Sequence, residues 1–449
     1  MHLWIAKKIS FSEILGEGLC LSDYARNPAL FSSFLHFEPR QVEEKINSLA
    51  HQPFPGRQSL MACLTTYHQN LQAPAETLKN IALLDNPRTL VVLTGQQPGL
   101  LTGPLYTIYK TISCLRQARN LEQTYGRPCV PVFWIASEDH NLEEVTSIFL
   151  PSPSGDEYRK LSFHPQRGHF KRPAGLLPLP EKRLGPFMRE VKEILSPLLH
   201  FEEMASILKA TLEHSLTLGE WFARLMLSLF KPYGLVIVDP VQAGIKQLIV
   251  PLWDRILPDP LALPELVDAA GRRLEQRGYR RQLVTYPSRC PFFLYEKGCR
   301  ERVMWDGQAF HTRNQKYSPE QVWETAHLRP ECLSPNVYLR PIVSEYLFPT
   351  LLYLAGPGET GYFVQIKEVY EYFGLKMPIV YPRLSATVQE NPSCGLILKP
   401  GSLQGVGLQE RKLNVWYLLS RYGLEFLTAL YHLPVEDYCS HLLIEVFKG

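Results

Sequence analysis

Long hydrophobic runs, paired cysteines and an excess of charge of one sign are all missing from this sequence of 449 residues. No apolar run approaches the roughly 18 residues that a transmembrane helix needs. The richest apolar stretch, residues 342–355, is interrupted by Glu345 and Pro349. The first nine residues include Lys7 and Lys8 and lack the apolar core of a secretory signal. We therefore expect a cytoplasmic protein without a membrane span.

The nine cysteines form no CxxC pair, which argues against a zinc ribbon or a thioredoxin-like redox motif, and no metal ligands are predicted. We expect reduced, mostly buried thiols. The 47 Lys and Arg residues nearly balance the 44 Asp and Glu residues, giving a net charge of +3. This balance argues against a nucleic-acid binder that relies on a basic surface. With 45% hydrophobic residues, the chain can bury a sizeable core.

Five short apolar runs predict buried strands, at residues 89–94, 129–135, 234–239, 350–355 and 377–381. The first two flank a helical pattern, with Thr102 as candidate N-cap and Pro104 in the first turn. Thr217 and Glu220 have capping-box spacing before another helix. A strand, a crossover helix and a second strand make a parallel pair. The pattern therefore predicts an α/β fold with an open, doubly wound parallel sheet.

The predicted elements divide the chain into a core with insertions. A hairpin is expected at residues 292–296 and 302–305, turning at Gly298. The segments are a helical N-terminal segment (1–88), the first half of the sheet core (89–150), an insertion (151–216), a core helix and strand (217–254), a second insertion with the hairpin (255–332), the second half of the core (333–390), a short linker (391–402) and a helical C-terminal segment (403–449).

Glycine-rich turns follow two of the predicted strands, at the edge where open α/β sheets bind ligands. Residues 94–103 offer three glycines and a helix start, hence backbone N–H groups for an anion, although they match no phosphate-loop formula. A turn needed only for packing is the alternative. Gln96 and Gln97 favour ligand contact, because amides are costly to bury without a hydrogen bond. Residues 356–360 form a similar turn and leave the same two interpretations open.

The polar run Glu138, Asp139, His140 and Asn141 follows the second strand. Asp139 and His140 have the chemistry of a base and its partner, or of metal ligands. The alternative is a helix N-cap formed by Asp139 or Asn141, with solvated neighbours. Arg340 is a candidate partner for a carboxylate of a ligand or of the protein itself.

Three blocks of sequence resemble the BshC family of cysteine-adding ligases in bacillithiol biosynthesis, and together they cover most of the chain. The first is LTGQQPGLLTGPLYT (93–107) with PVFWIASEDH (131–140). The second comprises LSPNVYLRP (333–341), AGPGE (355–359) and PRLS (382–385). The third is GLQER (407–411) with Asn414.

This resemblance implies a Rossmann-like core related to class I aminoacyl-tRNA synthetases, with connecting-peptide insertions. It also implies a reaction that joins the cysteine carboxyl to the amino group of glucosaminyl malate, with ATP and an optional Mg²⁺. Because a carboxylate is a poor acyl donor, the cysteinyl group must be activated, for example as an adenylate. The HIGH signature of the synthetases is replaced here by LTGP (101–104), and residues 382–387 lack the lysines of KMSKS. Phosphate contacts would therefore rest on backbone amides and Arg383.

The loops and the resemblance together predict three sets of site residues. The predicted catalytic residues are Asp139, His140 and Glu138. The predicted ATP-binding residues are Thr94, Gly95, Gln96, Gln97, Gly99, Thr102, Gly103, Gly356, Gly358, Glu359, Arg383 and Ser385. The predicted substrate-binding residues are Tyr106, Asn141, Asn336 and Arg340.

The family carries a long coiled coil after the PRLS segment, where this chain has only residues 391–402. Two prolines and two glycines in this linker exclude a heptad-patterned helix. We therefore expect the coiled coil to be absent and the protein to be a monomer or weak dimer. Two other functions stay open: a catalytically lapsed member that binds a nucleotide or metabolite, and another transferase or nucleotidyltransferase on the same core.

Overall fold

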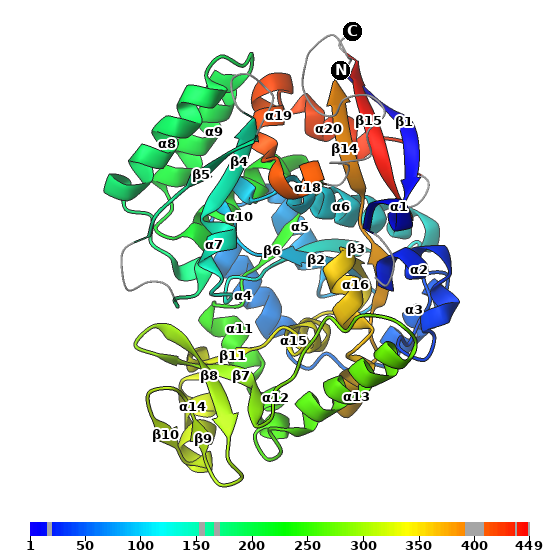
Figure 1. Cartoon of the computed structure of the whole chain (residues 1–449), viewed down its shortest axis with the longest axis vertical. Helices are drawn as coiled ribbons and strands as arrows, with labels where there is room; N and C mark the ends of the chain where they lie inside the picture. The colour runs from blue at the N-terminus through cyan, green and yellow to red at the C-terminus, as the bar shows by residue number, and fades with distance from the viewer. Residues whose placement is uncertain (16–19, 152–157, 166–170, 391–407, 436–437, 448–449) are drawn as a thin grey trace.

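A five-stranded parallel sheet forms the centre of the protein (Figure 1). The computed structural model describes residues 1–15, 20–151, 158–165, 171–390, 408–435 and 438–447. All five predicted strands are present and every pairing in the sheet is parallel. In spatial order they are β13 (Ile379–Pro382), β12 (Thr350–Ala355), β2 (Leu90–Gln96), β3 (Cys129–Ile135) and β6 (Val236–Val238).

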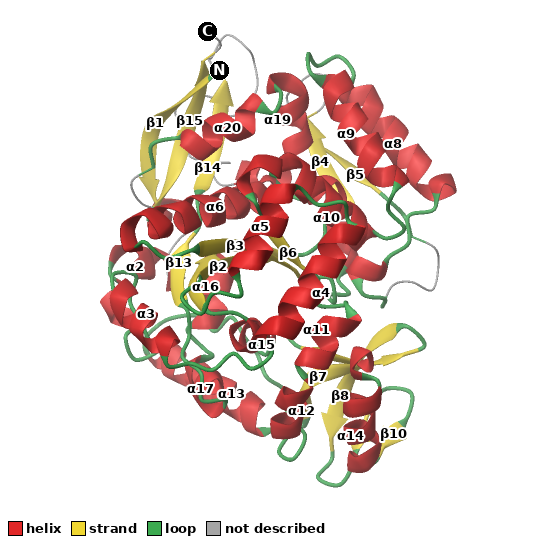
Figure 2. Ribbon diagram, turned by 180° about the vertical axis from the view of Figure 1, so that it is seen from behind, coloured by secondary structure: helices red, strands yellow, loops and turns green. Residues whose placement is uncertain are grey.

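Helices cover both faces of this sheet, because successive strand side chains point to opposite sides. Val92 packs with Cys114 of α6 (Leu105–Tyr125) on one face. Val91 and Leu93 pack with Leu64 on the other face. The second face carries α4 (Arg57–Asn70) and α5 (Ala75–Leu83), seen in front of the sheet in Figure 2. Helix α11 (Ala243–Leu248) packs against α4, and α12 (Val250–Ile256) follows it. The doubly wound Rossmann-like prediction is thereby confirmed.

The strand order places a topological switch point between β2 and β12. The chain builds β2, β3 and β6 in one direction and then returns to add β12 and β13 on the opposite side of β2. The loops leaving β2 and β12 therefore diverge, which opens a crevice at their carboxyl ends. The core is completed by α10 (Leu218–Leu229), α15 (Arg340–Leu347), α16 (Pro357–Phe363) and α17 (Lys367–Tyr372).

Both insertions carry secondary structure of their own. The short α7 (Leu142–Val145) and β4 (Ser147–Pro151) lead into the first insertion, which contains β5 (Tyr158–Ser162), α8 (Glu181–Leu195) and α9 (Phe201–Glu213). The predicted hairpin of the second insertion is confirmed, and it turns at Lys297 and Gly298, both at positive φ. Its elements are α13 (Ala262–Gln276), β7 (Arg289–Glu296), β8 (Cys299–Trp305), β9 (Phe310–His311), β10 (Lys316–Tyr317) and α14 (Pro319–Leu328), with β11 (Leu333–Pro335) closing the sheet.

The two terminal segments, which were predicted to be helical, each contain one strand in addition to helices. Strand β1 (His2–Ser10) pairs antiparallel with β15 (Ser440–Phe447), and β15 pairs in parallel with β14 (Ser385–Glu390) (Figure 1). Pairing between the ends of a long chain leaves no local sequence signal. The remaining terminal elements are helical, as predicted: α1 (Phe11–Leu15), α2 (Cys20–Arg26), α3 (Val42–Ala50), α18 (Leu408–Lys412), α19 (Val415–Tyr422) and α20 (Glu425–His432).

The structure tests two predicted helix starts. Thr102 is not the N-cap of α6, since that position belongs to Pro104 and the Thr102 hydroxyl donates to the carbonyl of Leu101. Thr217 does cap α10, where its hydroxyl accepts a hydrogen bond from the Glu220 amide at 3.3 Å. The predicted linker at 391–402, and with it the absent coiled coil, lies outside the described residues. In the described part of the chain, no helix combines the length and the apolar character that crossing a membrane requires.

Candidate functional site

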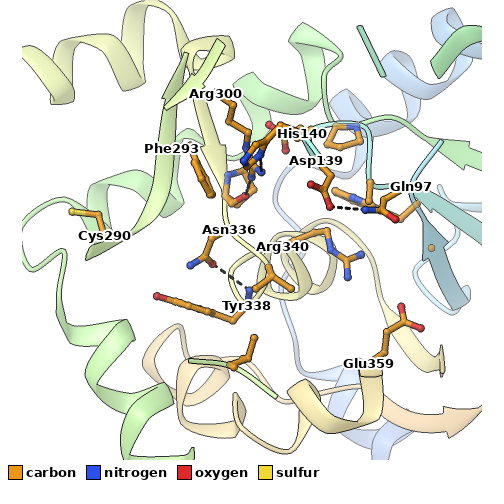
Figure 3. Close-up of a pocket in the computed structure, with 18 of the residues that line it drawn as sticks. Gln97, Asp139, His140, Cys290, Phe293, Arg300, Asn336, Tyr338, Arg340 and Glu359 are labelled. Carbon is orange, nitrogen blue, oxygen red and sulfur yellow. Dashed lines mark hydrogen bonds between the residues drawn. The ribbon is translucent and has the colours of Figure 1, made fainter. Parts of the chain in front are cut away.

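Two clefts open at the carboxyl edge of the sheet and meet at its switch point. The insertion cleft, of about 390 Å³, lies between the core and the second insertion and is lined by residues that include Asp139, His140, Phe293, Arg300, Asn336 and Arg340 (Figure 3). The glycine-loop cleft, of about 820 Å³, is lined by residues that include Gly99, Gly103, Tyr106, Lys110, Gly356, Arg383 and Lys412. Gln96, Gln97 and Glu359 line both clefts.

The polar run after β3 is held in place by buried contacts. Ser137 donates a short hydrogen bond to Asp239, which follows β6, and burial raises the pKa of Asp239 to about 6. The Glu138 carboxylate pairs with the buried Lys246 of α11 and accepts a hydrogen bond from the Tyr295 hydroxyl at 3.2 Å. Glu138 lines the insertion cleft, but Lys246 and Tyr295 already occupy its Oε1 atom. It therefore fixes the loop that carries Asp139 and His140.

Asp139 reaches toward the glycine turn of the neighbouring strand. Its Oδ2 atom accepts a hydrogen bond from Gln97 Nε2 at 2.8 Å (Figure 3), and its Oδ1 atom accepts from the Asn141 amide at 3.1 Å. Asn141 occupies the N-cap position of α7, where its side chain caps nothing, and it lines the glycine-loop cleft. This hydrogen bond joins the loop after β3 to the loop after β2, and both loops were predicted separately as parts of the site.

His140 lies on the wall of the insertion cleft beside Arg300 of β8. Its Nδ1 atom is 3.4 Å from a terminal nitrogen of Arg300, and its ring packs edge-on against Phe293. Burial, followed by the charge of Arg300, lowers the pKa of His140 below its ordinary value. The imidazole is therefore neutral near pH 7.

Asn336 and Arg340 stand at the start of α15, facing the insertion cleft. Asn336 Oδ1 accepts from the amides of Tyr338 (3.2 Å) and Leu339 (3.0 Å), which fixes the turn into this helix. Arg340 donates to the Tyr362 hydroxyl at 2.7 Å. Among the described residues no carboxylate lies within ion-pair distance of Arg340, so the carboxylate-binding interpretation for a ligand is favoured.

The first glycine turn has an unusual backbone. Leu101, Thr102 and Gly103 follow one another with φ values of 48°, 67° and 72°. Asn414 holds this turn, because its Nδ2 atom donates to the carbonyls of Leu101 (2.9 Å) and Gly103 (2.8 Å). A Cβ atom on Gly99 would lie 2.7 Å from the Cα atom of Gly103. The close approach of these two residues therefore requires glycine at position 99. Backbone strain of this kind clusters at ligand-binding sites.

A buried lysine that sequence analysis missed crosses the switch point. Lys110 of α6 lies 2.6 Å from Glu359 and donates to the Gly95 carbonyl (2.8 Å) and to Gln96 Oε1 (3.0 Å). Glu359 also accepts from the Gly356 amide and from the Tyr353 hydroxyl, each at 2.8 Å. The sequence signal that could have identified Lys110 is a single charged residue among the regularly spaced apolar residues of this helix.

Arg383 follows β13 and forms a two-point ion pair with Glu410 of α18, at 2.8 and 3.1 Å. Its guanidinium lies over the ring of Tyr106, and its buried Nε atom has no hydrogen-bond partner among the described residues. Glu410 also accepts from the Ser385 hydroxyl, which contacts His441 of β15 at 2.8 Å. Glu410 thus holds the guanidinium of Arg383 in place while the arginine lines the glycine-loop cleft.

The predicted site residues fall into two groups. Most line one of the two clefts, including Gly95, Gly358 and Asn141. Thr94, Thr102 and Ser385 line neither cleft: the Thr94 hydroxyl donates to the Leu354 carbonyl, and Ser385 serves the Glu410 network. Sequence analysis missed several lining residues whose partners come from distant segments, namely Lys110, Phe293, Arg300, Tyr338, Tyr362 and Lys412.

An open α/β sheet with ligand clefts at its switch point and two insertions defines a Rossmann-like protein. A family model for "Bacillithiol biosynthesis BshC, N-terminal Rossmann-like domain" matches residues 6–384. The chain belongs to the BshC family.

Curated relatives agree with this assignment. Three proteins with the name "Putative cysteine ligase BshC" come from Desulforamulus reducens, Halalkalibacterium halodurans and Geobacillus thermodenitrificans. They are 33%, 32% and 35% identical to this chain over 90%, 84% and 74% of its length. The matches span 75%, 70% and 61% of these relatives, so part of each relative has no counterpart here.

Proposed function

We propose that this protein is a ligase that joins the carboxyl group of cysteine to the amino group of glucosaminyl malate, with ATP as the activating substrate. One observation carries the proposal: two clefts of different chemistry share Gln96, Gln97 and Glu359. A ligation needs an activated acyl group and an amine brought together, and a shared wall between two clefts supplies that geometry. The names of the relatives supply the reaction class.

The glycine-loop cleft suits ATP. It is lined by the side chains of Lys110, Lys160, Arg383, Arg411 and Lys412. The unpartnered Nε atom of Arg383 and the backbone of the strained turn add donors for phosphate oxygens. Glu143 and Glu144 line the same cleft and are suited to the Mg²⁺ that accompanies ATP. ATP supplies the leaving group that makes the cysteine carboxyl an acyl donor.

The insertion cleft suits the amino sugar. Its volume of about 390 Å³ lies within the range of small-ligand sites. Arg340 is placed to bind a carboxylate of the malate part. When the amine attacks the activated carbonyl carbon, an amide bond forms, the bond from that carbon to the activating group breaks, AMP or phosphate leaves, and the amine loses a proton. Asp139, held by Gln97 at the shared wall, is the acceptor we assign to that proton.

The test measures thiols in cells with and without this protein, and product formation by the purified protein. We expect bacillithiol only when cysteine, glucosaminyl malate and ATP are all present. Release of AMP supports an adenylate, whereas release of ADP supports an acyl phosphate. The variant Lys79→Ala removes an exposed ion pair with Glu76 and serves as the control for effects of substitution and purification alone. Nucleotide binding without bacillithiol under any condition would favour the lapsed-enzyme alternative and contradict the proposal.

A further inference from the structure

Arg300 is held in one orientation by three contacts. Its Nε atom donates to the Ser334 hydroxyl at 2.9 Å, and one terminal nitrogen donates to the Pro335 carbonyl at 2.6 Å. The guanidinium also lies over the ring of Phe293, 3.8 Å from its centre. Only the other terminal nitrogen is directed at His140, as Figure 3 shows. A guanidinium carries hydrogen-bond donors and no acceptor.

This contact fixes where the proton of His140 lies. Because Arg300 can only donate, Nδ1 of His140 must accept, and a neutral imidazole then carries its hydrogen on Nε2. Resting on the proposed function, we infer that His140 presents an Nε2–H donor to the acyl oxygen of the substrate in the insertion cleft, and that Arg300 is the positioning residue that sets this tautomer. Among the described residues, Nε2 of His140 has no hydrogen-bond partner, which leaves it available to a ligand.

The charges around His140 agree with a neutral donor. Burial, Arg300 and Arg302 of β8, and Lys171 of the first insertion disfavour the imidazolium and lower the pKa of His140, whereas Asp139 favours it. Accepting a proton would place a cation against Arg300 at 3.4 Å. The role of His140 therefore differs from that of a general base, and the base is Asp139.

The donor would act on charge that develops during amide formation. Attack of the amine on the activated carbonyl carbon moves an electron pair onto the carbonyl oxygen, which becomes an oxyanion until the nucleotide leaves. A positioned donor aimed at this atom contributes roughly 10²- to 10³-fold to turnover. Arg340 lines the same cleft and is assigned to a carboxylate of the substrate, which leaves the carbonyl oxygen to His140.

The first experiment reads the tautomer directly and needs no activity. Histidines labelled with ¹⁵N are observed by two-bond ¹H–¹⁵N NMR, and the variant His140→Gln identifies the signal of His140. We expect a neutral ring with a protonated Nε2 and an unprotonated Nδ1 at pH 7.5, changing in the variant Arg300→Met. A protonated Nδ1, or an imidazolium, at this pH would overturn the inference whether or not the protein is a ligase.

The second experiment separates a donor from a base. A glutamine amide nitrogen reaches the position of Nε2 and can donate but cannot take up a proton at neutral pH. We expect His140→Gln to keep turnover within about tenfold of the wild type, and His140→Ala to lose about 10²-fold, the donor's contribution. Equal losses in both variants would show that His140 acts as a base. In Arg300→Met, nothing prevents Nδ1 from carrying the hydrogen, so turnover should fall towards that of His140→Ala; unchanged turnover together with an unchanged tautomer contradicts the positioning role.

Discussion

The ammonium group of Lys110 lies 2.6 Å from the carboxylate of Glu359, and this pair joins α6 to α16 across the switch point of the sheet. Both side chains are largely buried, with 5% and 15% of their surfaces exposed. Lys110 also donates to the carbonyl of Gly95 at the end of β2, and Glu359 accepts from the amide of Gly356, which follows β12. The two turns that line the glycine-loop cleft are therefore fixed relative to each other by one ion pair.

We expect Lys110→Met to destabilise the protein by roughly 3–5 kcal/mol, because it leaves the Glu359 carboxylate buried without its partner. The double variant Lys110→Met/Glu359→Gln should recover part of this loss. Urea unfolding measures both, with Lys79→Met, which removes an exposed pair, as the control expected to change stability by less than about 1 kcal/mol. A loss of the same small size in Lys110→Met would show that the pair does not hold the turns.

A side chain at Gly103 should weaken ATP binding. Gly103 has φ of 72° and lies in the turn held by Asn414, whereas Gly126, at φ of 57°, ends α6 with open space around it. Gly126→Ala should cost about 1–2 kcal/mol of stability, because Gly126 is left-handed helical. Gly103→Ala should cost up to about 3 kcal/mol, because ψ of −155° places Gly103 in a region that is restricted to glycine. Titration calorimetry should show reduced ATP affinity only for Gly103→Ala. Equal ATP affinity of the two variants would remove the turn from the nucleotide site.

Arg383 should matter through its shape as well as its charge. Lysine cannot keep the two-point contact with Glu410 and also offer the Nε donor. We expect Arg383→Lys to raise KM for ATP by about tenfold or more, the loss of one charge-assisted contact. Glu410→Gln, which preserves the shape of the partner, should have a smaller effect. The exposed Arg273→Lys, paired with Glu368, is the control. Unchanged kinetics of Arg383→Lys would contradict this assignment.

The stability of the protein should fall as the pH falls below about 6.5, partly because of His68. This histidine is buried, its Nδ1 atom contacts the Leu64 carbonyl, and its Nε2 atom accepts from the Ile237 amide. Burial lowers its pKa from 6.5 to about 4. Between these values the unfolded chain binds a proton that the folded protein does not bind, so lowering the pH favours unfolding.

This group alone contributes a slope of about 1.4 kcal/mol per pH unit. In the variant His68→Gln, the free energy of unfolding, measured in urea from pH 7 to 4.5, should lose that part of its pH dependence. The same slope in variant and wild type would show that His68 is not the titrating group.

The assembly state follows from the linker at 391–402. If a coiled coil is absent there, the apolar seam that would stabilise a dimer is absent too. We predict a monomer, or a weak dimer, at micromolar concentration. Light scattering during size-exclusion chromatography measures this directly. A species near twice 51.5 kDa that persists on dilution would show that another surface holds two chains together.

The core strands could be predicted because their signal is local. Each is a short apolar run bounded by turn residues, and a parallel sheet buried on both faces requires such runs. Strand β1 has no comparable signal: alternate residues such as Trp4 and Ala6 are exposed, and its partner β15 lies more than 400 residues further along the sequence. Tertiary pairing, which no window of sequence contains, makes this segment a strand.

The site was predictable only in part, namely where its residues lie in loops that directly follow the predicted strands. Loops that follow the strands, such as the one bearing Asp139, could be placed at the carboxyl edge from the strand order alone. Arg300 reaches this edge from the second insertion and contacts His140. Lys246 reaches it from α11 and pairs with Glu138. Only the folded structure brings these distant residues together. Charged residues inside apolar patterns, as at Lys110, were the signal that sequence analysis left unused.

The pairing of β1 with β15 has a consequence for how this protein is made. A ribosome synthesises β1 (His2–Ser10) more than 400 residues before β15 (Ser440–Phe447), so β1 stays without its partner until the later strand emerges. Strand β14, which directly follows Arg383, waits for the same partner. The nascent chain can complete its central sheet once β13 has emerged, but the contacts behind Arg383 are complete only when β15 supplies His441. Ribosome-bound chains stalled before β15 should therefore carry an unfinished glycine-loop cleft.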